Sequence, residues 1–347
     1  DVYGRLERSL ADQYPEVEVP KLFEFRSWAG SDRDGNPHVT PEVTAQTLDR
    51  QRTVILERYA TALEDLTGDL SQDADRVTVG EPVRERLATY ADAHPEVAET
   101  AAERYPNQPY RQLLRLVRER LDRVDDLRPG GYDGPQALRE DLELLATDLR
   151  ANDAGAVAAA QVAPLVRQVA TFGFSLASLD LRDHRENHTA AVGEVLARAD
   201  VPYAKVDEDA RVRTLTDAIL QDEPIVDLAD TSGLGETATR VCRRFDALAD
   251  WQREYGADAI DTYCISMCEE PSHVLEVLFL ADQAGVVDLP DHCGLDVVPL
   301  LETESALSGA RRIMGTLFEN EAYAAALATR GDVQEGMLGY SDSCKEN

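Results

Sequence analysis

Five short apolar runs are spaced along a chain otherwise dominated by helical periodicity, and this alternation most narrows the possible folds. Amphipathic segments separate most of the runs. Strands that alternate with helices form a parallel sheet covered by helices, because parallel neighbours need a crossover connection. The sequence therefore predicts an α/β fold. The five predicted strands are residues 21–25, 174–182, 260–267, 295–302 and 336–340.

A long block without strand character lies between the first two predicted strands. Thr40 and Pro41 have the pattern of an N-cap followed by proline at the first helical position, which predicts a helix to about Asp69. Further predicted helices cover residues 81–93, 109–127, 135–151 and 154–171.

Polar clusters follow the ends of the predicted strands. Barrel enzymes place their chemistry at these ends, whereas a doubly wound sheet binds ligands only at its switch point. The pattern therefore predicts a (β/α)8 TIM-type barrel that is incomplete here, since five of the eight strands are found. We expect a single partial barrel domain over 1–347 with a large all-helical insertion at 70–172, belonging to a longer protein. The clusters are Asp32-Arg33-Asp34, Arg182, Glu269-Glu270, Glu302-Thr303-Glu304 and Ser341-Asp342-Ser343.

The charge of the chain is extreme. Sixty-six acidic residues face 35 basic ones, which gives a net charge of −31, and the only lysines are Lys21, Lys205 and Lys345. Such a charge repels nucleic-acid backbones and anionic membranes, so we expect no nucleic acid and no membrane as partners. Disordered chains also carry high charge, but they lack the apolar periodicity present here. We predict a folded, halophilic-type protein whose acidic surface is screened by salt.

Membrane and disulfide signals are lacking in the sequence. No stretch of about 18 uncharged apolar residues occurs, and no signal peptide opens the chain, which favours a soluble cytoplasmic protein. Five scattered cysteines indicate reduced thiols. Cys264, Cys268 and Cys293 beside His292 could form a zinc site, but Cys264 lies in a predicted strand and Cys-x-x-Cys pairs are absent, so this site is disfavoured.

Residues 26–37, RSWAGSDRDGNP, are too polar for a core. A plain turn explains the aspartates, asparagine, glycine and proline, but it leaves Arg33 and Trp28 unexplained. A calcium loop of the EF-hand type beginning at Asp32 would need glycine at its sixth position and glutamate at its twelfth, where proline and valine stand. Functional residues concentrate in loops, so a binding role is favoured.

Two short motifs are weak. Residues 233–238, GLGETA, match a dinucleotide fingerprint and open a helix, but the preceding IVDL is a poor strand and no acid-tipped strand follows. Here Thr231 and Ser232 are candidate helix caps. Residues 173–177, GFSLA, resemble a hydrolase elbow, yet Ser175 precedes a strand instead of following one.

His184 and His188 are spaced like metal ligands on a helix. Arg185 stands where the protease pattern H-E-x-x-H needs glutamate. A solvated helical face is therefore the favoured interpretation of this pair.

The polar clusters together resemble the motifs of one family. FRSWAGSDRDGNPHVT is similar to the loop S-W-x-G-x-D-R-D-G-N-P of phosphoenolpyruvate carboxylases. Five collinear motifs over residues 25–347 make the resemblance far more specific than any one of them. The other four segments, in the family's order, are FGFSLASLDLRDHRENHT, YCISMCEEPSHVLEV, VVPLLET and LGYSDSCKEN.

The resemblance implies an α/β barrel decorated with helices. It implies a carboxy-lyase that carboxylates phosphoenolpyruvate with bicarbonate to oxaloacetate and phosphate, an anaplerotic carbon fixation, through carboxyphosphate and a metal-bound enolate. It also implies Mg²⁺ or Mn²⁺ as cofactor, a homotetramer and allosteric control.

The resemblance places the metal ligands on Glu302 and Asp342. A hard dication that also holds an anionic substrate typically takes one or two carboxylates and leaves its other positions to water and substrate. The metal would then act as a Lewis acid on the developing enolate.

Arg182 and Lys345 match the family's phosphate-handling cations and are the implied catalytic residues. Phosphoryl transfer depends chiefly on positioning and on neutralising oxygen charge, which suits both. The alternative for Arg182 is a surface ion pair with Asp180 or Asp183.

The loop around residues 28–37 resembles the one that lines the family's pocket. We expect Arg33 to be held by Asp32 or Asp34. The pocket-loop and substrate-binding residues implied by the resemblance are Trp28, Asp32, Arg33, Asp34 and Asn36.

Departures from the family pattern are mild where motifs are present. The loop reads WAGSD where many members have a second glycine, and the last motif reads SCKEN where many read SAKDA or SNKDG. The family's catalytic histidine, in a T-A-H-P-T-E motif, is expected before residue 1, with Gly/Arg-rich loops and an inhibitor site for aspartate after residue 347. We therefore expect these residues alone to be inactive.

Two other readings stay open. Another phosphoenolpyruvate-using barrel, a kinase or mutase relative, would also need a metal and an enolate, and bicarbonate-dependent phosphate release separates it from a carboxylase. A helical interaction scaffold would bind no divalent metal, and Glu302→Gln with Asp342→Asn would then change nothing.

Overall fold

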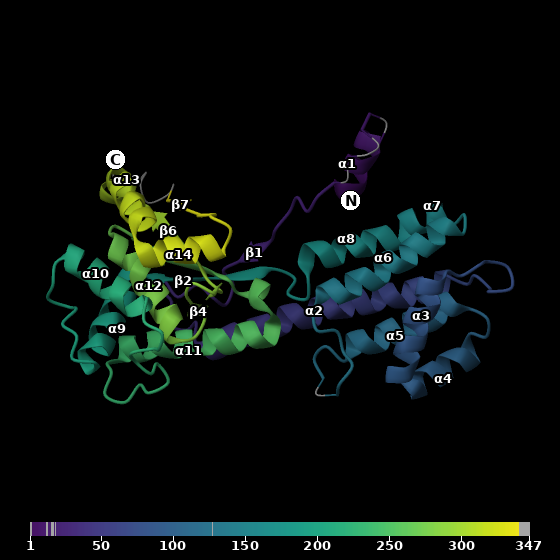
Figure 1. Ribbon diagram of the computed structural model, residues 1–347, viewed down its shortest axis with the longest axis horizontal. Helices are drawn as coiled ribbons and strands as arrows, with labels where there is room; N and C mark the ends of the chain where they lie inside the picture. Colours follow the sequence, from purple (N-terminus) through teal and green to yellow (C-terminus); the bar gives the residue numbers. More distant parts are fainter. Residues whose placement is uncertain (1, 12, 15–16, 18, 127, 340–347) are drawn as a thin grey trace. The chain divides into compact units, whose positions relative to one another are not determined.

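The structure is a computed structural model, and it describes residues 2–11, 13–14, 17, 19–126 and 128–339 (Figure 1). The chain forms two compact units. One comprises Asp1–Phe25 and Arg50–Ala177, and the other comprises Arg26–Asp49 and Ser178–Asn347. The boundary at residue 49 falls within the long helix α2 (Pro41–Asp69).

The second unit contains a five-stranded parallel sheet among the described residues. Its order, β1-β2-β3-β6-β7, follows the chain, so each crossover joins adjacent strands. A short antiparallel pair, β4 (Val287–Asp288) with β5 (His292–Cys293), lies outside this sheet. The sheet strands are β1 (Arg26–Ser27), β2 (Ser178–His184), β3 (Thr262–Ser266), β6 (Asp296–Leu301) and β7 (Met337–Leu338).

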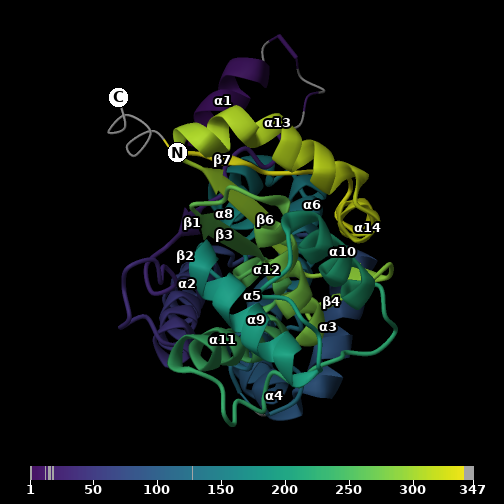
Figure 2. The ribbon, with the colours of Figure 1, turned by 90° about the vertical axis from the view of Figure 1, so that its left-hand side faces the viewer.

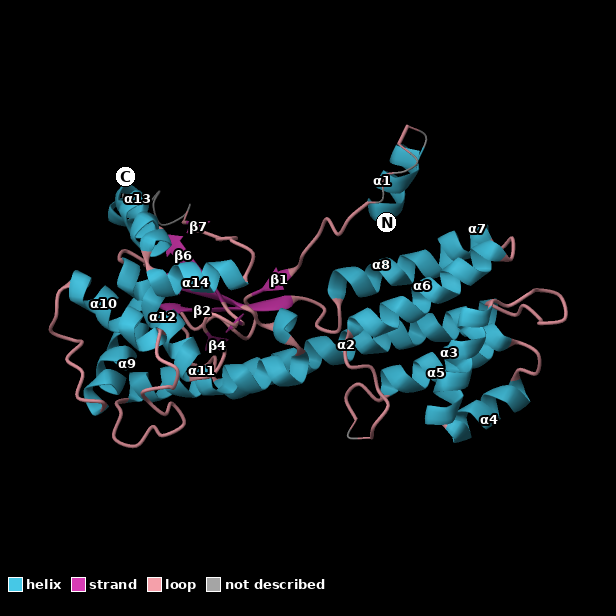
Figure 3. Ribbon diagram, viewed as in Figure 1, coloured by secondary structure: helices cyan, strands magenta, loops and turns pink. Residues whose placement is uncertain are grey.

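Helices cover the strands of this unit (Figures 2 and 3). Helix α9 packs against β2, and α12 packs against β3 and β6. Every residue of β3 is buried, as expected for a parallel strand covered on both faces. The helices are α9 (Arg185–Arg198), α10 (Glu208–Ile219), α11 (Glu236–Tyr255), the 3-10 turn η2 (Ala257–Ala259), α12 (Pro271–Gln283), α13 (Glu304–Glu319) and α14 (Glu321–Thr329).

Helices are the only regular secondary structure among the described residues of the first unit. Proline occupies one of the first two positions of α3, α4, α5 and α6, where its fixed φ and missing N–H are tolerated. Their apolar faces share a core with Tyr59 and Leu63 of α2. The helices are α1 (Val2–Ala11), α3 (Glu81–Ala93), α4 (Pro95–Arg104), α5 (Pro109–Asp122), α6 (Pro135–Ala151), α7 (Gly155–Val157), the π-helix η1 (Ala158–Val162) and α8 (Ala163–Phe172).

Asp141 of α6 is a buried acidic residue of this unit. Asp141 accepts hydrogen bonds from the hydroxyls of Tyr90 at 2.7 Å and Tyr132 at 2.5 Å. It also forms an ion pair with Arg86, while the guanidinium of Arg120 stacks over the Tyr132 ring at 4.1 Å. A buried carboxylate is tolerated here because it is both paired and hydrogen-bonded.

Most predicted helices are confirmed, since 41–69, 81–93 and 135–151 match α2, α3 and α6. The helix predicted at 109–127 ends earlier, at Asp122. The segment predicted at 154–171 is interrupted by the π-helix η1, and α4 was not predicted.

The strand predicted at residues 21–25 is wrong. Its aromatic side chains pack in the helical unit instead, Phe23 against Tyr3 at 5.6 Å and Phe25 against Phe172 at 5.2 Å between ring centroids. A short apolar run can therefore form an extended segment outside a sheet. Strand β1 begins at Arg26, the residue directly after the predicted segment.

The second predicted strand is shifted along the chain. Residues 173–177 form a turn, with Gly173 and Leu176 at positive φ, and Phe174 lies in the helical core. Strand β2 begins only at Ser178. The motif at 173–177 thus precedes a strand, as predicted.

Residues 220–232, which include the IVDL segment, form no strand, and the GLGETA motif leads into α11. The predicted caps are wrong, because Gly235 is the N-cap and donates its N–H to Glu194 Oε2 at 2.6 Å. Cys264 lies in β3 as predicted, and within the described ranges no group of three His, Cys, Asp or Glu could hold a metal.

No helix in the described part of the chain is both long and apolar enough to cross a membrane. The α/β class and the parallel sheet are confirmed. The single partial domain over 1–347 and the insertion at 70–172 stay predictions.

Candidate active site

Arg182 of β2 is held by two carboxylates. Its Nη1 donates to Asp32 Oδ2 at 3.2 Å and its Nη2 donates to Asp34 Oδ2 at 3.0 Å. The guanidinium carbon also lies 4.8 Å from the centre of the Trp28 ring, within range of a cation–π contact. The two contacts use both terminal nitrogens, so they fix the plane of the guanidinium as well as its place.

Backbone pairing brings this loop to Arg182. The N–H of Arg33 donates to the carbonyl of Arg182 at 2.9 Å, and the N–H of Arg182 donates to the carbonyl of Ser31 at 3.4 Å. This bridge, which pairs Asp32 with Arg182, continues the parallel pairing of β1 with β2. Asp32 also accepts from the N–H of Asp34 at 3.0 Å, which tightens the turn.

The predicted partner of Arg33 is wrong. Arg33 is buried and donates to the carbonyl of Ser31 at 3.1 Å and to Thr44 Oγ1 at 2.6 Å. Burial, and then repulsion from Arg244, lowers the pKa of Arg33 to about 9. Arg182 takes both aspartates instead, because the β1–β2 register places it between them.

The predicted alternative partners of Arg182 are also wrong. Asp183 pairs with Arg244 at 2.5 Å. Asp180 lies 4.0 Å from Arg26 Nε and shares the face of β2 that carries Arg182. Burial raises the pKa of Asp180 to about 6, although Arg26 and a hydrogen bond from Trp28 lower it in part.

Asn36 serves the turn itself. It is exposed, and its Oδ1 accepts from the N–H of His38 at 3.1 Å. Of the five pocket-loop residues, the structure thus brings Trp28, Asp32 and Asp34 to Arg182, while Arg33 donates to the Ser31 carbonyl within the loop.

Glu302 follows the last residue of β6 and is almost fully buried. Its Oε1 accepts from the N–H of Met267 at 2.8 Å, and Met267 has the left-handed φ of +56°. Gly339 approaches so closely that an added Cβ would lie 2.2 Å from the Glu302 Cβ. Glycine is therefore required at this position.

Arg182 and Glu302 share one face of the sheet. Arg182 pairs with Cys264, and Cys264 pairs with Val298. Glu302 lies four residues beyond Val298, an even step that keeps it on the same face. Because all three strands are parallel, both side chains lie toward the carboxyl ends of the strands.

Two predicted site residues, Asp342 and Lys345, lie outside the described residues. The buried Glu302 is a hard oxygen donor of the type that Mg²⁺ and Mn²⁺ take, so it fits the role of one metal ligand.

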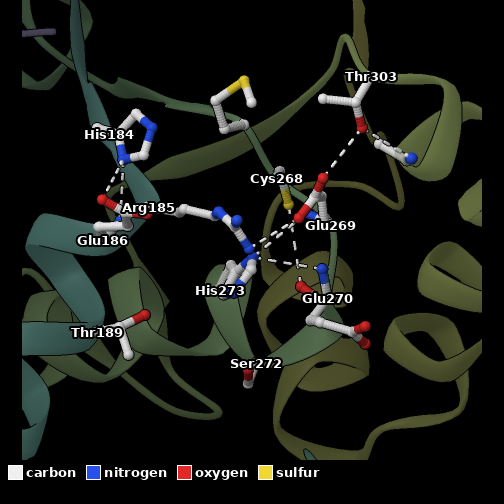
Figure 4. A network of polar contacts seen from close by, with 12 residues as sticks. His184, Arg185, Glu186, Thr189, Cys268, Glu269, Glu270, Ser272, His273 and Thr303 are labelled. Atoms are coloured by element: carbon white, nitrogen blue, oxygen red, sulfur yellow. Dashed lines mark hydrogen bonds and ion pairs between the residues drawn. The ribbon is translucent and has the colours of Figure 1, made fainter.

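A second polar network joins three strand ends (Figure 4). Arg185, the first residue of α9, pairs with Glu269 Oε2 at 2.9 Å. The hydroxyl of Thr303 donates to Glu269 Oε1 at 3.1 Å, and the same hydroxyl caps α13 by accepting from the N–H of Ala306. Since Thr303 follows Glu302, Glu269 links the end of β2 to the end of β6 by side-chain contacts.

His273 of α12 binds the backbone of the loop that carries Glu269 and Glu270 (Figure 4). Its Nδ1 accepts from the N–H groups of Glu269 and Glu270 at 3.2 and 3.3 Å. Burial lowers the pKa of His273 to about 3, so the ring is neutral and can accept both bonds.

The predicted solvated face at His184 and His188 is wrong. His188 is fully buried, with Nε2 2.8 Å from the hydroxyl of Tyr263. His184 is the N-cap of α9 and accepts from the N–H of Glu186 at 3.2 Å.

Sequence reasoning missed Arg244. It stands on the apolar face of α11, where Val241, Phe245 and Leu248 recur at helical spacing. A charged residue within such a stripe is the signal that could have found it, because a buried arginine needs a carboxylate.

The fold and the site define a parallel α/β protein with a charged site at the carboxyl ends of its strands. The family model of phosphoenolpyruvate carboxylase matches residues 1–347. The chain therefore belongs to the phosphoenolpyruvate carboxylase family.

Relatives carry the same family name. A phosphoenolpyruvate carboxylase of Xanthomonas euvesicatoria is 37% identical over 346 residues, 99% of this chain and 38% of the relative. One from Roseiflexus castenholzii is 34% identical over 363 residues, with the same coverage, and one from Prochlorococcus marinus is 35% identical over 383 residues. The chain thus spans 38% of the length of the relatives it matches.

Proposed function

We propose that the intact protein carrying this chain carboxylates phosphoenolpyruvate with bicarbonate to give oxaloacetate and phosphate. The observation that carries the proposal is the placement of Arg182 and Glu302 on one face of the sheet, toward the carboxyl ends of β2 and β6. Membership of the family supports it.

The chemistry begins at phosphorus. An oxygen of bicarbonate attacks the phosphorus, the bond to the enol oxygen breaks, and carboxyphosphate and the enolate of pyruvate form. Carboxyphosphate then releases CO₂ and phosphate, and the enolate carbon attacks CO₂. Arg182 and Lys345 are proposed to neutralise the charge on the phosphoryl oxygens, and Asp32 and Asp34 orient Arg182 for this role.

The pocket loop contributes a wall to this site. Trp28 presents its ring to the Arg182 guanidinium and is 37% exposed, so it can also contact a substrate. A wall of this kind excludes water from carboxyphosphate and the enolate, both of which water would destroy. Arg33 holds the loop through Ser31 and Thr44.

Glu302 and Asp342 are the proposed ligands of Mg²⁺ or Mn²⁺. When bound, the ion supplies Lewis-acid stabilisation of negative charge on oxygen. Glu302 is held in place for this role by the N–H of Met267.

The remaining proposals concern the whole protein. The parallel sheet in chain order supports a TIM-type barrel with an all-helical insertion at 70–172. The net charge of −31 supports a halophilic, cytoplasmic protein that binds neither nucleic acid nor membranes. A homotetramer under allosteric control rests on the family resemblance alone.

The test is bicarbonate-dependent release of phosphate from phosphoenolpyruvate, followed together with oxaloacetate formation. We expect equal amounts of both products from the intact protein and a loss of both in Glu302→Gln. Phosphate release that ignores bicarbonate would favour another phosphoenolpyruvate-using barrel. No turnover and no Mn²⁺ binding would favour an interaction scaffold.

A further inference from the structure

Arg182 and Asp183 are neighbours in β2, and their side chains point to opposite faces of the sheet. Arg182 faces the pocket loop. Asp183 is fully buried on the other face, between the sheet and its helices. A residue that fixes Asp183 therefore acts on Arg182 through one peptide unit.

Arg244 of α11 fixes Asp183. Its Nη1 lies 2.5 Å from Asp183 Oδ2 and also donates to the hydroxyl of Tyr263 at 2.6 Å. That hydroxyl in turn contacts Nε2 of His188 at 2.8 Å. Both Arg244 and Asp183 are fully buried, so water does not weaken their attraction.

Asp183 also shapes the turn from β2 into α9. Its Oδ1 accepts from the N–H of His184 at 2.8 Å and from Asn187 Nδ2 at 2.6 Å, and its carbonyl accepts from Ser266 Oγ at 3.2 Å. The Asp183 carboxylate thus connects β2 to α9 and, through Arg244, to α11. The backbone carbonyl of Asp183 connects β2 to Ser266 of β3.

The pocket loop is hydrogen-bonded to the backbone of Arg182, the residue before Asp183. The carbonyl and N–H of Arg182 carry the two bonds to Arg33 and Ser31. A rotation at Asp183 would tilt the Arg182 carbonyl and with it the loop that holds both aspartates.

A buried ion pair is a poor source of stability, because desolvation of the two charges offsets their attraction. It does impose a defined position, since Arg244 Nη1 contacts both Asp183 Oδ2 and the hydroxyl of Tyr263. The pair is therefore better explained by the position that it enforces than by the stability that it contributes.

We propose that Asp183 and Arg244 are positioning residues that fix the end of β2, so that Arg182 keeps its direction toward the phosphate group of the substrate. This inference rests on the proposed function of Arg182. It predicts that breaking the pair weakens binding of phosphate-bearing ligands more than it slows turnover.

The test compares two neutral replacements of ion pairs in the intact protein. Asp183→Asn with Arg244→Met removes the pair behind Arg182, and Asp141→Asn with Arg86→Met removes an ion pair in the helical unit as a control. The side chain of Asp141 is fully buried, as that of Asp183 is, and it accepts from two tyrosine hydroxyls, while the side chain of Arg86 is 33% exposed. The measurements are kcat and KM for phosphoenolpyruvate, the Kd for inorganic phosphate, and the unfolding midpoint.

We expect the first double variant to raise KM and the phosphate Kd about tenfold, with kcat changed less than about threefold. The control should leave KM and Kd unchanged, whatever its unfolding midpoint. Should the double variant not fold, Arg244→Lys keeps the charge but replaces the guanidinium Nη1 between Asp183 and Tyr263 with a shorter ammonium side chain, and its KM for phosphoenolpyruvate and its phosphate Kd should still exceed those of the wild type.

Wild-type KM and phosphate Kd in a folded Asp183/Arg244 variant would overturn the inference, and so would an equal rise in the control. A wild-type protein that binds phosphate but forms no oxaloacetate would contradict the proposed function instead, and the phosphate Kd of the variants would still decide the positioning role. A wild-type protein that binds no phosphate would overturn both.

Discussion

Arg182 and Asp34 lie 148 residues apart in the sequence, yet Nη2 of one donates to Oδ2 of the other at 3.0 Å. The other terminal nitrogen of Arg182, Nη1, donates to Asp32 Oδ2 at 3.2 Å. A lysine offers a single nitrogen and cannot reproduce this fork. We expect Arg182→Lys to raise KM for phosphoenolpyruvate more than about tenfold.

Steady-state kinetics of the intact protein check this prediction. The matched control is Arg198→Lys, because Arg198 binds the backbone carbonyls of Asp230 and Ser232 on the exposed surface. An equal rise of KM in both variants would show that the effect is general and not due to the two-carboxylate contact.

Because His188 is buried in its neutral form, we expect the free energy of unfolding to fall at acid pH. Burial lowers its pKa from 6.5 to about 4, so unfolding takes up a proton between these values and is favoured as the pH falls. At 1.36 kcal/mol per pH unit, the difference corresponds to about 3 kcal/mol. The free energy of unfolding should therefore fall from pH 6.5 to 4 by about 3 kcal/mol more in the wild type than in His188→Gln. Urea unfolding measures it, and parallel profiles would contradict the buried neutral state.

Because Glu276 is buried, we expect it to lower the free energy of unfolding as the pH rises, the opposite of the effect of His188. It is fully buried and accepts from the hydroxyls of Tyr203 at 2.7 Å and Thr189 at 2.8 Å, and burial raises its pKa from 4.5 to about 7. The folded state then holds a proton that the unfolded state releases, so this contribution is present below pH 4.5 and is lost as the pH rises through 7.

Replacement of Glu276 by glutamine should remove that slope. Between pH 4.5 and about 8, the wild type should lose about 3 kcal/mol of unfolding free energy relative to Glu276→Gln. Urea unfolding at both pH values measures the difference. A constant difference between the two proteins would mean that Glu276 is ionised in the fold at all these pH values.

Salt should stabilise the protein. Sixty-six acidic residues against 35 basic ones repel one another in the compact state, and the screening length falls from about 10 Å at 0.1 M salt to about 3 Å at 1 M. We expect the unfolding temperature to rise steadily from about 0.1 M to about 2 M KCl. An unchanged unfolding temperature would argue against adaptation of this surface to salt.

Local patterns predicted the helices well. Apolar periodicity and early prolines depend on residues within one or two turns, so 81–93 and 135–151 were placed at their observed bounds. The apolar run at residues 21–25 misled, because the aromatic side chains of an extended segment can pack against helices as well as against a sheet.

The pairing of charges could not be predicted in the same way. Which arginine meets Asp32 and Asp34 depends on the register between β1 and β2, and residues 28–177 separate these strands in the sequence. The motif therefore predicted the loop but assigned its aspartates to Arg33 instead of Arg182. Arg244 was missed for the same reason, since its carboxylate lies on another element.

The destination of a labelled oxygen tests the proposed reaction most directly. If bicarbonate attacks phosphorus, one of its oxygens must end in the released phosphate. Turnover of phosphoenolpyruvate with ¹⁸O-labelled bicarbonate by the intact protein should give phosphate that carries one labelled oxygen for each oxaloacetate formed. Oxaloacetate formed with unlabelled phosphate would contradict this route, because water and not bicarbonate would then have attacked phosphorus.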